Sequence, residues 1–126
     1  MRAVDSNVLV RLLARDDPKQ VEPAERFVES GGWVSLLALA ECVWVLKAIY
    51  RLDPAQLASA IALCLSHATL SLQDADVVES ALASFRARPK LGFADCLMIE
   101  IARKTGHLPL GTFDRDLDEL DGAEMI

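Results

Sequence analysis

Hydrophobic residues recur along the chain in two patterns, short apolar runs and longer segments with helical spacing. Helical spacing and cap signals predict helices at residues 7–15, 18–30, 36–50, 54–67, 74–86, 93–105 and 114–120. Short apolar runs predict strands at residues 2–4, 33–35, 69–72, 108–111 and 123–126. Because strands alternate with helices, the pattern predicts an α/β fold in which helices cover both faces of a parallel sheet.

Composition narrows the class of protein. The 126 residues fit one domain, which we expect to span residues 1–126. With 52% hydrophobic and 25% charged residues, the chain is able to bury a core and is not expected to be disordered. The longest apolar run, from Gly31 to Leu46, contains Glu41 and is shorter than the ~20 residues of a membrane span. The N-terminus has no cleavable signal pattern, so the expected location is the cytoplasm.

The cysteines argue against two common kinds of small domain. Cys42, Cys64 and Cys96 lie in apolar runs, and no two of them have Cys-x-x-Cys spacing. Their odd number argues against a disulfide framework, and their spacing argues against a zinc site. We interpret them as buried thiols in a reducing compartment.

Four acidic residues have only partial structural explanations. Asp5 and Asp114 follow predicted strands, and each could simply cap the next helix. Asp95 lies near a helix start, where the helix dipole stabilises a carboxylate by about 0.3–1 kcal/mol, but its apolar neighbours indicate that it faces inward. Glu41 is the only charged residue between positions 31 and 46, so we expect it to be buried. A buried carboxylate needs compensation, either from one Arg or Lys or from a cation.

The four acids share a kind of position. Asp5 and Asp114 end strands, Glu41 and Asp95 are expected in first turns of helices, and such positions in a parallel sheet can converge on one edge. Two unit charges about 4 Å apart repel by ~4 kcal/mol at an effective dielectric of ~20, so such a cluster raises its pKa values or binds cations. Oxygen ligands without His or Cys select Mg²⁺ or Mn²⁺, whose commonest role is phosphoryl transfer.

Four motifs carry these acids in a fixed order along the chain. They are Val4-Asp5-Ser6-Asn7, Leu39-Ala40-Glu41, Phe93-Ala94-Asp95 and Thr112-Phe113-Asp114-Arg115-Asp116-Leu117. In order, spacing and chain length they resemble the PIN-domain family, and in particular its VapC-type toxins. The resemblance covers nearly the whole chain, and the ordered set is more specific than any single motif. The sequence departs from the family pattern at Gly111, where an apolar strand residue is more usual.

This resemblance implies a three-layer α/β/α sandwich that acts as an endoribonuclease, the toxin of a toxin–antitoxin pair. It implies a Mg²⁺ or Mn²⁺ site formed by Asp5, Glu41, Asp95 and Asp114, with support from Asn7 and Thr112. It also implies hydrolysis of RNA phosphodiester bonds by a metal-activated water, a homodimer, and an antitoxin that blocks the site. We expect Asp5 and Asp95 to hold the principal metal, and Glu41 and Asp114 to position the water or a second ion.

Two further sets of residues bear on partners. The net charge of −6 is unfavourable for RNA binding, yet basic residues flank the acidic motifs. We expect Arg88, Lys90 and Arg115 to bind substrate phosphates, with solvated surface charge as the alternative. Apolar residues of the helices at 18–30 and 54–67 could line an antitoxin groove, although core packing is the default; they are Val21, Phe27, Val28, Leu57, Ile61 and Leu65.

Aromatic residues make up only 6% of the chain, so base stacking on aromatic rings is a weak expectation. We interpret Trp33 and Trp44 as core or interface anchors instead.

Three other interpretations use the same acids. A catalytically silent PIN-like domain would only bind a partner, and the complete set of four acids argues against it. A phosphoacceptor receiver domain would need adjacent acids after the first strand and a late Lys, which the sequence lacks. An acidic mimic of nucleic acid would expose its acids, whereas Glu41 is expected to be buried.

Overall fold

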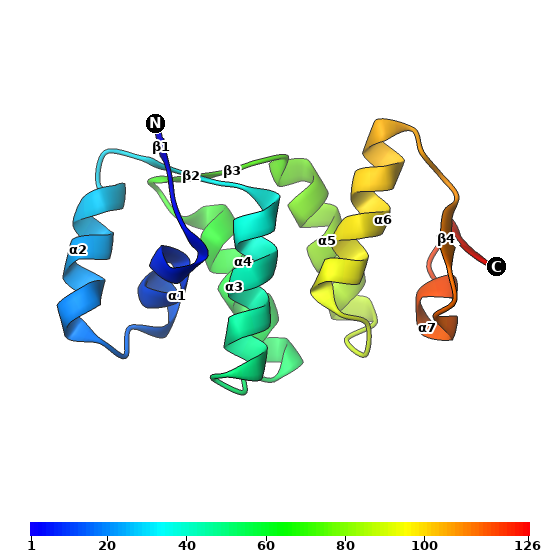
Figure 1. Cartoon of the computed structure of the whole chain (residues 1–126), viewed down its shortest axis with the longest axis horizontal. Helices are drawn as coiled ribbons and strands as arrows, with labels where there is room; N and C mark the ends of the chain where they lie inside the picture. The colour runs from blue at the N-terminus through cyan, green and yellow to red at the C-terminus, as the bar shows by residue number, and fades with distance from the viewer. The chain divides into compact units, whose positions relative to one another are not determined.

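The computed structural model describes residues 1–126 as seven helices and five strands (Figure 1). The helices are α1 (Ser6–Ala14), α2 (Pro18–Val28), α3 (Leu36–Ala48), α4 (Pro54–Ser66), α5 (Ala75–Ala87), α6 (Phe93–Thr105) and α7 (Arg115–Asp118). The strands are β1 (Arg2–Ala3), β2 (Gly32–Val34), β3 (Leu70–Leu72), β4 (Leu110–Thr112) and β5 (Ala123–Met125). The chain forms two compact units, Met1–Ala75 and Asp76–Ile126.

Three parallel strands form the sheet of the first unit, in the order β1-β2-β3. In the central strand, Trp33 is in register with Ala3 on one side and with Ser71 on the other. Because the strands run in the same direction, their carboxyl ends lie at one edge of this sheet.

Helix α3 begins at that edge and is capped twice. Ser35 Oγ accepts a 3.0 Å hydrogen bond from the amide of Ala38, and Gln73 Oε1 accepts a 2.9 Å hydrogen bond from the amide of Leu36. Ser35 follows β2 and Gln73 follows β3, so residues that leave the sheet at this edge satisfy free amides in the first turn of α3.

The core of the first unit forms where α1 packs against α2 and α3, and where α4 packs against α3 and β3. Its largest fully buried side chains are Leu9, Val28, Val34, Leu39, Cys42, Leu46, Ile61 and Cys64. Gly32 of β2 is also buried, and a Cβ atom there would lie 3.0 Å from Val28 Cγ1 and 3.1 Å from Val4 Cγ1. No side chain larger than hydrogen therefore fits at this point without movement of its neighbours.

The second unit contains helices α5, α6 and α7 and a parallel pair of strands, β4 and β5. Phe85 of α5 and Phe93 of α6 meet edge to face, with ring centroids 6.1 Å apart. Lys104 at the end of α6 forms a 2.9 Å ion pair with Asp76 of α5.

The structure confirms the predicted α/β class. All twelve predicted elements are present, with ends within two residues of those expected. Helices and parallel strands are consistent with the three-layer α/β/α architecture, and the strands form two hydrogen-bonded sheets, β1-β2-β3 and β4-β5. Strand β4 begins two residues later than predicted because Pro109 has no amide to donate, whereas the Leu110 amide donates to Gly122 O at 2.8 Å.

All three cysteines are buried and unpaired, as the sequence predicts. Burial raises the pKa of Cys42 to about 12 and the pKa values of Cys64 and Cys96 to about 11. These thiols therefore stay protonated at neutral pH. None of the helices is both long and apolar enough to cross a lipid bilayer.

We predict that Gly32→Ala destabilises the protein by about 1–3 kcal/mol, because the added methyl group overpacks the contact with Val28 and Val4. Gly111→Ala is the matched control, since its nearest atom would be at an ordinary 3.7 Å. Urea unfolding of both variants measures the effect. Equal stability of Gly32→Ala and the wild type would contradict the close packing of β2.

Candidate functional site

Asp5 stands two residues after β1 and immediately before α1. It occupies the N-cap position, but its carboxylate accepts no hydrogen bond from the amides of the first turn. Asp5 Oδ1 instead accepts a 3.2 Å hydrogen bond from Ser6 Oγ, and Ser6 is the only buried polar residue of the chain. The alternative that Asp5 caps α1 is therefore wrong. A buried hydroxyl orients the exposed carboxylate of Asp5 and leaves its second oxygen without a protein partner.

Glu41 is exposed, so the prediction that it is buried is wrong. It also lies in the second turn of α3 rather than the first. Its helical neighbours Leu37 and Trp44 are 71% and 65% exposed, which places three residues of one helix side in solvent. The exposure of Trp44 also excludes it from the core. No hydrogen bond or ion pair engages the Glu41 carboxylate, and its exposure removes one argument against an acidic mimic.

Asp95 is the third residue of α6, in the first turn as predicted. The residue is half-buried rather than turned fully inward, and nearby Met98 is 48% exposed. Gly92 is the N-cap of α6 and offers no side chain, so α6 begins without a capping carboxylate. The Asp95 side chain makes no hydrogen bond or ion pair within the second unit.

Asp114 follows β4 and caps α7, so the capping explanation holds for this acid. Its Oδ1 accepts hydrogen bonds from the amides of Asp116 at 2.8 Å and Leu117 at 3.4 Å. Thr112 Oγ1 in turn accepts a 2.9 Å hydrogen bond from the Asp114 amide. Thr112 therefore fixes the backbone that presents Asp114, and both capping bonds end on one carboxylate oxygen.

Pairing with basic residues separates these four acids from many others in the chain. Elsewhere, acids contact Arg or Lys at 2.5–3.0 Å, as in Arg11–Asp16, Arg15–Glu25, Arg88–Glu119 and Lys104–Asp76. The four candidate acids have no ion pair with any residue of their own unit. Asp5 and Glu41 belong to the first unit, and Asp95 and Asp114 belong to the second. No group of three or more acidic, His or Cys side chains is gathered as a metal cage.

The donors available at these positions are those that Mg²⁺ and Mn²⁺ prefer. Each of the four residues offers at least one carboxylate oxygen without a protein partner. Cys42 and Cys96 are sequence neighbours of Glu41 and Asp95, but their buried thiols have pKa values of about 12 and 11. Because the thiols remain protonated, the donor set is oxygen only, which fits a hard divalent cation rather than zinc.

The basic residues predicted to bind phosphate differ in how far they are already engaged. Arg88 contacts Glu119 at 2.6 Å, and Lys90 lies 3.3 Å from Asp116. Arg115 is exposed and makes no ion pair. Exposed ion pairs are worth only about 0–1 kcal/mol, so phosphate could displace the partners of Arg88 and Lys90 at small cost.

Three polar residues that hold these positions were missed by the sequence analysis. Ser6 orients Asp5, while Ser35 and Gln73 start the helix that carries Glu41. Ser6 lies in the Val4–Asn7 motif, and its position next to Asp5 is the sequence signal for this contact. Gln73 caps a helix 37 positions away in sequence, which no local pattern reveals. Asn7, predicted to support the site, is exposed and makes no side-chain hydrogen bond.

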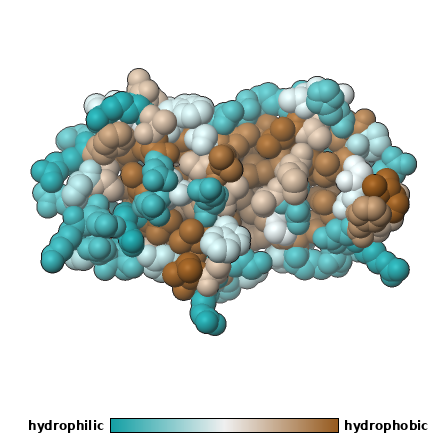
Figure 2. Space-filling model, viewed as in Figure 1, coloured by the Kyte–Doolittle hydropathy of each residue, from teal (hydrophilic) through white to brown (hydrophobic).

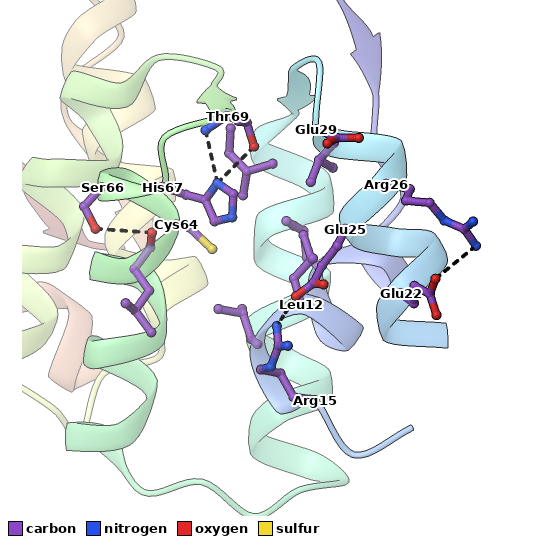
Figure 3. A pocket seen from close by; sticks show the side chains of 15 residues that line it. Leu12, Arg15, Glu22, Glu25, Arg26, Glu29, Cys64, Ser66, His67 and Thr69 are labelled. Carbon is purple, nitrogen blue, oxygen red and sulfur yellow. Dashed lines mark hydrogen bonds and ion pairs between the residues drawn. The ribbon is translucent and has the colours of Figure 1, made fainter. Parts of the chain in front are cut away.

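An open groove of about 650 Å³ lies between α1, α2 and α4 in the first unit (Figure 3). Leucines of α1, Val28 and Leu63 form its apolar walls, and His67 at the end of α4 points toward α2. Three glutamates follow one side of α2 along the rim, Glu22, Glu25 and Glu29. Of the six apolar residues predicted to line a groove, Val28 lines this one and Phe27 lines a smaller pocket. Val21, Leu57 and Ile61 are buried in the core, the default expectation.

A second groove, of about 550 Å³, shares Leu13 and Leu63 with the first. Asp16 and Tyr50 lie at this groove, where Tyr50 Oη donates to Asp16 Oδ2 at 2.9 Å. This hydrogen bond is the main cause that lowers the pKa of Asp16, while the bond from Arg11 to Tyr50 is the main cause that raises the pKa of Arg11. Asp16 therefore stays charged at neutral pH, in an ion pair with Arg11.

Comparison with known proteins gives a family match over almost the whole chain. The PIN domain model matches residues 2–123, which include all four candidate acids. No curated protein and no solved structure matches the chain. PIN domains are generally nucleases, they typically use divalent metals, and many pair with antitoxins and bind RNA. The chain belongs to the PIN domain family.

Proposed function

We propose that the chain is a Mg²⁺- or Mn²⁺-dependent endoribonuclease formed by a single domain over residues 1–126. Its metal ligands are the four acids Asp5, Glu41, Asp95 and Asp114. One observation carries the proposal: in a PIN domain, the acids at these four motif positions have no basic partner within their units. The participation of acids from both units rests on family membership and on the order of the motifs.

The chemistry follows from the kinds of group available. A bound divalent cation supplies charge stabilisation for the phosphate and lowers the pKa of a water molecule. The protein supplies carboxylate oxygens in fixed orientations: Ser6 holds Asp5, and the α7 cap holds Asp114. Arg115 follows Asp114, is exposed and has no acidic partner, and we assign it a phosphate contact. Arg88 and Lys90 contribute phosphate contacts when their acidic partners are displaced.

The four acids are proposed to divide the work. Asp5 and Asp95 hold the principal metal, whereas Glu41 and Asp114 position the nucleophilic water or a second ion. One Asp114 oxygen accepts both capping bonds, so the other remains for the water or the second ion.

The proposal extends to a role as the toxin of a toxin–antitoxin pair in the cytoplasm. Three unpaired cysteines support a reducing compartment. The two grooves of the first unit, which share Leu13 and Leu63, support an antitoxin site, because their apolar walls suit the apolar side of an amphipathic helix. Acids outnumber arginines among the residues that line them, which are Glu22, Glu25, Glu29, Asp16, Asp53, Arg15 and Arg26, so the lining is negative. A basic antitoxin helix fits this charge.

A homodimer belongs to the same proposal. The exposed side chains of Leu37 and Trp44 on α3 support it, since exposed apolar patches commonly mark interfaces.

We predict that the wild type cleaves single-stranded and hairpin RNAs in millimolar Mn²⁺ and that EDTA abolishes cleavage. Asp95→Asn should lower the rate by roughly 100-fold or more, because a ligand of the cation is lost. Asp118→Asn is the matched control, as this exposed acid of α7 has no side-chain partner. A wild type that neither cleaves nor binds metal would favour the catalytically silent alternative.

The Mn²⁺ dependence of the same assay tests the division of labour. Asp5→Asn and Asp95→Asn should raise the Mn²⁺ concentration for half-maximal rate more than Glu41→Gln and Asp114→Asn. Equal shifts in all four variants would contradict the ranking.

For the antitoxin groove, we predict that a synthetic amphipathic helix with one leucine face and one lysine face binds the wild type. Leu63→Asp should abolish binding because it places a charge on the apolar wall, and Ile49→Asp, at an equally exposed residue outside the grooves, should not. Fluorescence anisotropy measures binding, and sedimentation of the same samples reports the dimer. Equal binding of a glutamate-faced helix would contradict the charge complementarity.

A further inference from the structure

Phe113 is the most exposed large hydrophobic residue of the chain, at 81%. Phe85 and Phe93 are each 3% exposed, and Phe27 lies under the guanidinium of Arg2, 3.8 Å from its ring centroid. Phe113 is therefore the only phenyl ring with both faces largely open. Hydrophobic residues are visible at the surface around β4 and the C-terminus in Figure 2. A single exposed apolar residue is common in proteins, so its exposure alone indicates no function.

The backbone on both sides of Phe113 is held rigidly. On one side, the carbonyl of Thr112 accepts a 3.0 Å hydrogen bond from the Ile126 amide. On the other side, Thr112 Oγ1 accepts from the Asp114 amide at 2.9 Å, and Asp114 Oδ1 accepts from two amides of α7. Leu117 of α7 is 5% exposed and anchors this turn in the second unit. The backbone that carries the ring is thus fixed, so a contact with the ring needs to order only its side-chain torsions.

The neighbours of Phe113 include cations as well as the acids of α7, Asp116 and Asp118. Asp114, a proposed metal ligand, follows it directly, and the exposed, unpaired Arg115 comes next. Arg115 and Asp116 both lie on α7. The Lys90 ammonium lies 3.3 Å from the Asp116 carboxylate, so Lys90 adds a second cation to this surface. An open aromatic face beside cations is the combination that binds single-stranded nucleic acid, where bases stack and phosphates pair with basic residues.

We propose that Phe113 stacks on an unpaired base of the RNA substrate next to the scissile phosphate, and that Arg115 binds an adjacent phosphate. This inference rests on the proposed nuclease function and adds that the substrate is single-stranded at this base. It revises the weak expectation of base stacking, which rested on the low aromatic content of the chain.

Binding of a fluorescent 12-nucleotide single-stranded RNA tests the inference in the full-length chain, with Mg²⁺ present and Asp95→Asn as the non-cleaving background. Phe113→Ala and Phe113→Leu should weaken binding by roughly 5- to 100-fold, the usual effect of losing one stacked base. Phe113→Trp should bind at least as well as the parent. Ile126→Ala is the matched control, because Ile126 follows Met125, the register partner of Thr112, and is 69% exposed.

A second measurement identifies the contact as base stacking. An abasic site is moved along the 12-mer, and at one position it should weaken binding to the parent but not to Phe113→Ala. A fully paired RNA duplex should bind both equally.

Three results would overturn the inference. In the first, Phe113→Leu binds the RNA as tightly as the parent. In the second, Phe113→Ala and Ile126→Ala lose the same amount of RNA affinity, and in the third, Phe113→Ala dissociates a dimer. The second and third results would indicate an apolar protein contact. The proposed function is tested separately by cleavage. A wild type that cleaves RNA, with Phe113→Ala binding normally, would remove only the stacking role. A wild type that never cleaves, with Phe113→Ala binding poorly, would remove only the nuclease role.

Discussion

The parallel pairing of very short strands is the constraint on which the rest of this structure depends. In the first unit, β1, β2 and β3 run in one direction, so the residues after them, Asp5, Ser35 and Gln73, emerge at one edge of the sheet. Ser35 and Gln73 satisfy the first amides of α3. Asp5 has no such task, and its carboxylate keeps an oxygen available for chemistry. The same rule places Asp114 after β4 in the second unit.

Charge pairing distinguishes many acids of the chain from the four at the motif positions of the family. The chain has 13 basic and 19 acidic residues, and many of the acids contact an Arg or Lys. Exposed pairs of this kind add only about 0–1 kcal/mol each, so they say little about stability. The acids at the four motif positions have no basic partner within their units, but neither has Asp118, so the missing partner supports a metal site only together with the motifs. A divalent metal is the partner that such carboxylates are proposed to take.

Local sequence signals predicted most of the fold. Asp53 and Pro54 marked the start of α4, where a full capping box forms, and Gly106 ended α6 with a positive φ. These features depend on neighbours within a few positions, so the sequence contains all the information that they need. The helix-versus-strand alternation in turn predicted the parallel pairing.

Features that depend on tertiary contacts were not predictable in the same way. Helix α3 is apolar on nearly every side, so its composition did not reveal which side faces solvent, and Glu41 was wrongly assigned to the interior. The engagement of Arg88 by Glu119 joins residues 31 positions apart and left no local signal. The groove residues were misjudged for the same reason, since burial of Leu57 and Ile61 depends on how α4 packs.

A double-variant cycle with metal tests most directly whether the four acids act as one site. Melting temperatures are measured for the wild type, Asp5→Asn, Asp95→Asn and the double variant, each in EDTA and in about 1 mM Mn²⁺, where a ligand that binds the folded state raises the melting point. The account predicts that Mn²⁺ stabilises the wild type and that either single substitution removes most of this stabilisation. Combining the two substitutions should then reduce the Mn²⁺ effect little further. Additive losses, or a Mn²⁺ effect that survives both substitutions, would contradict a shared site.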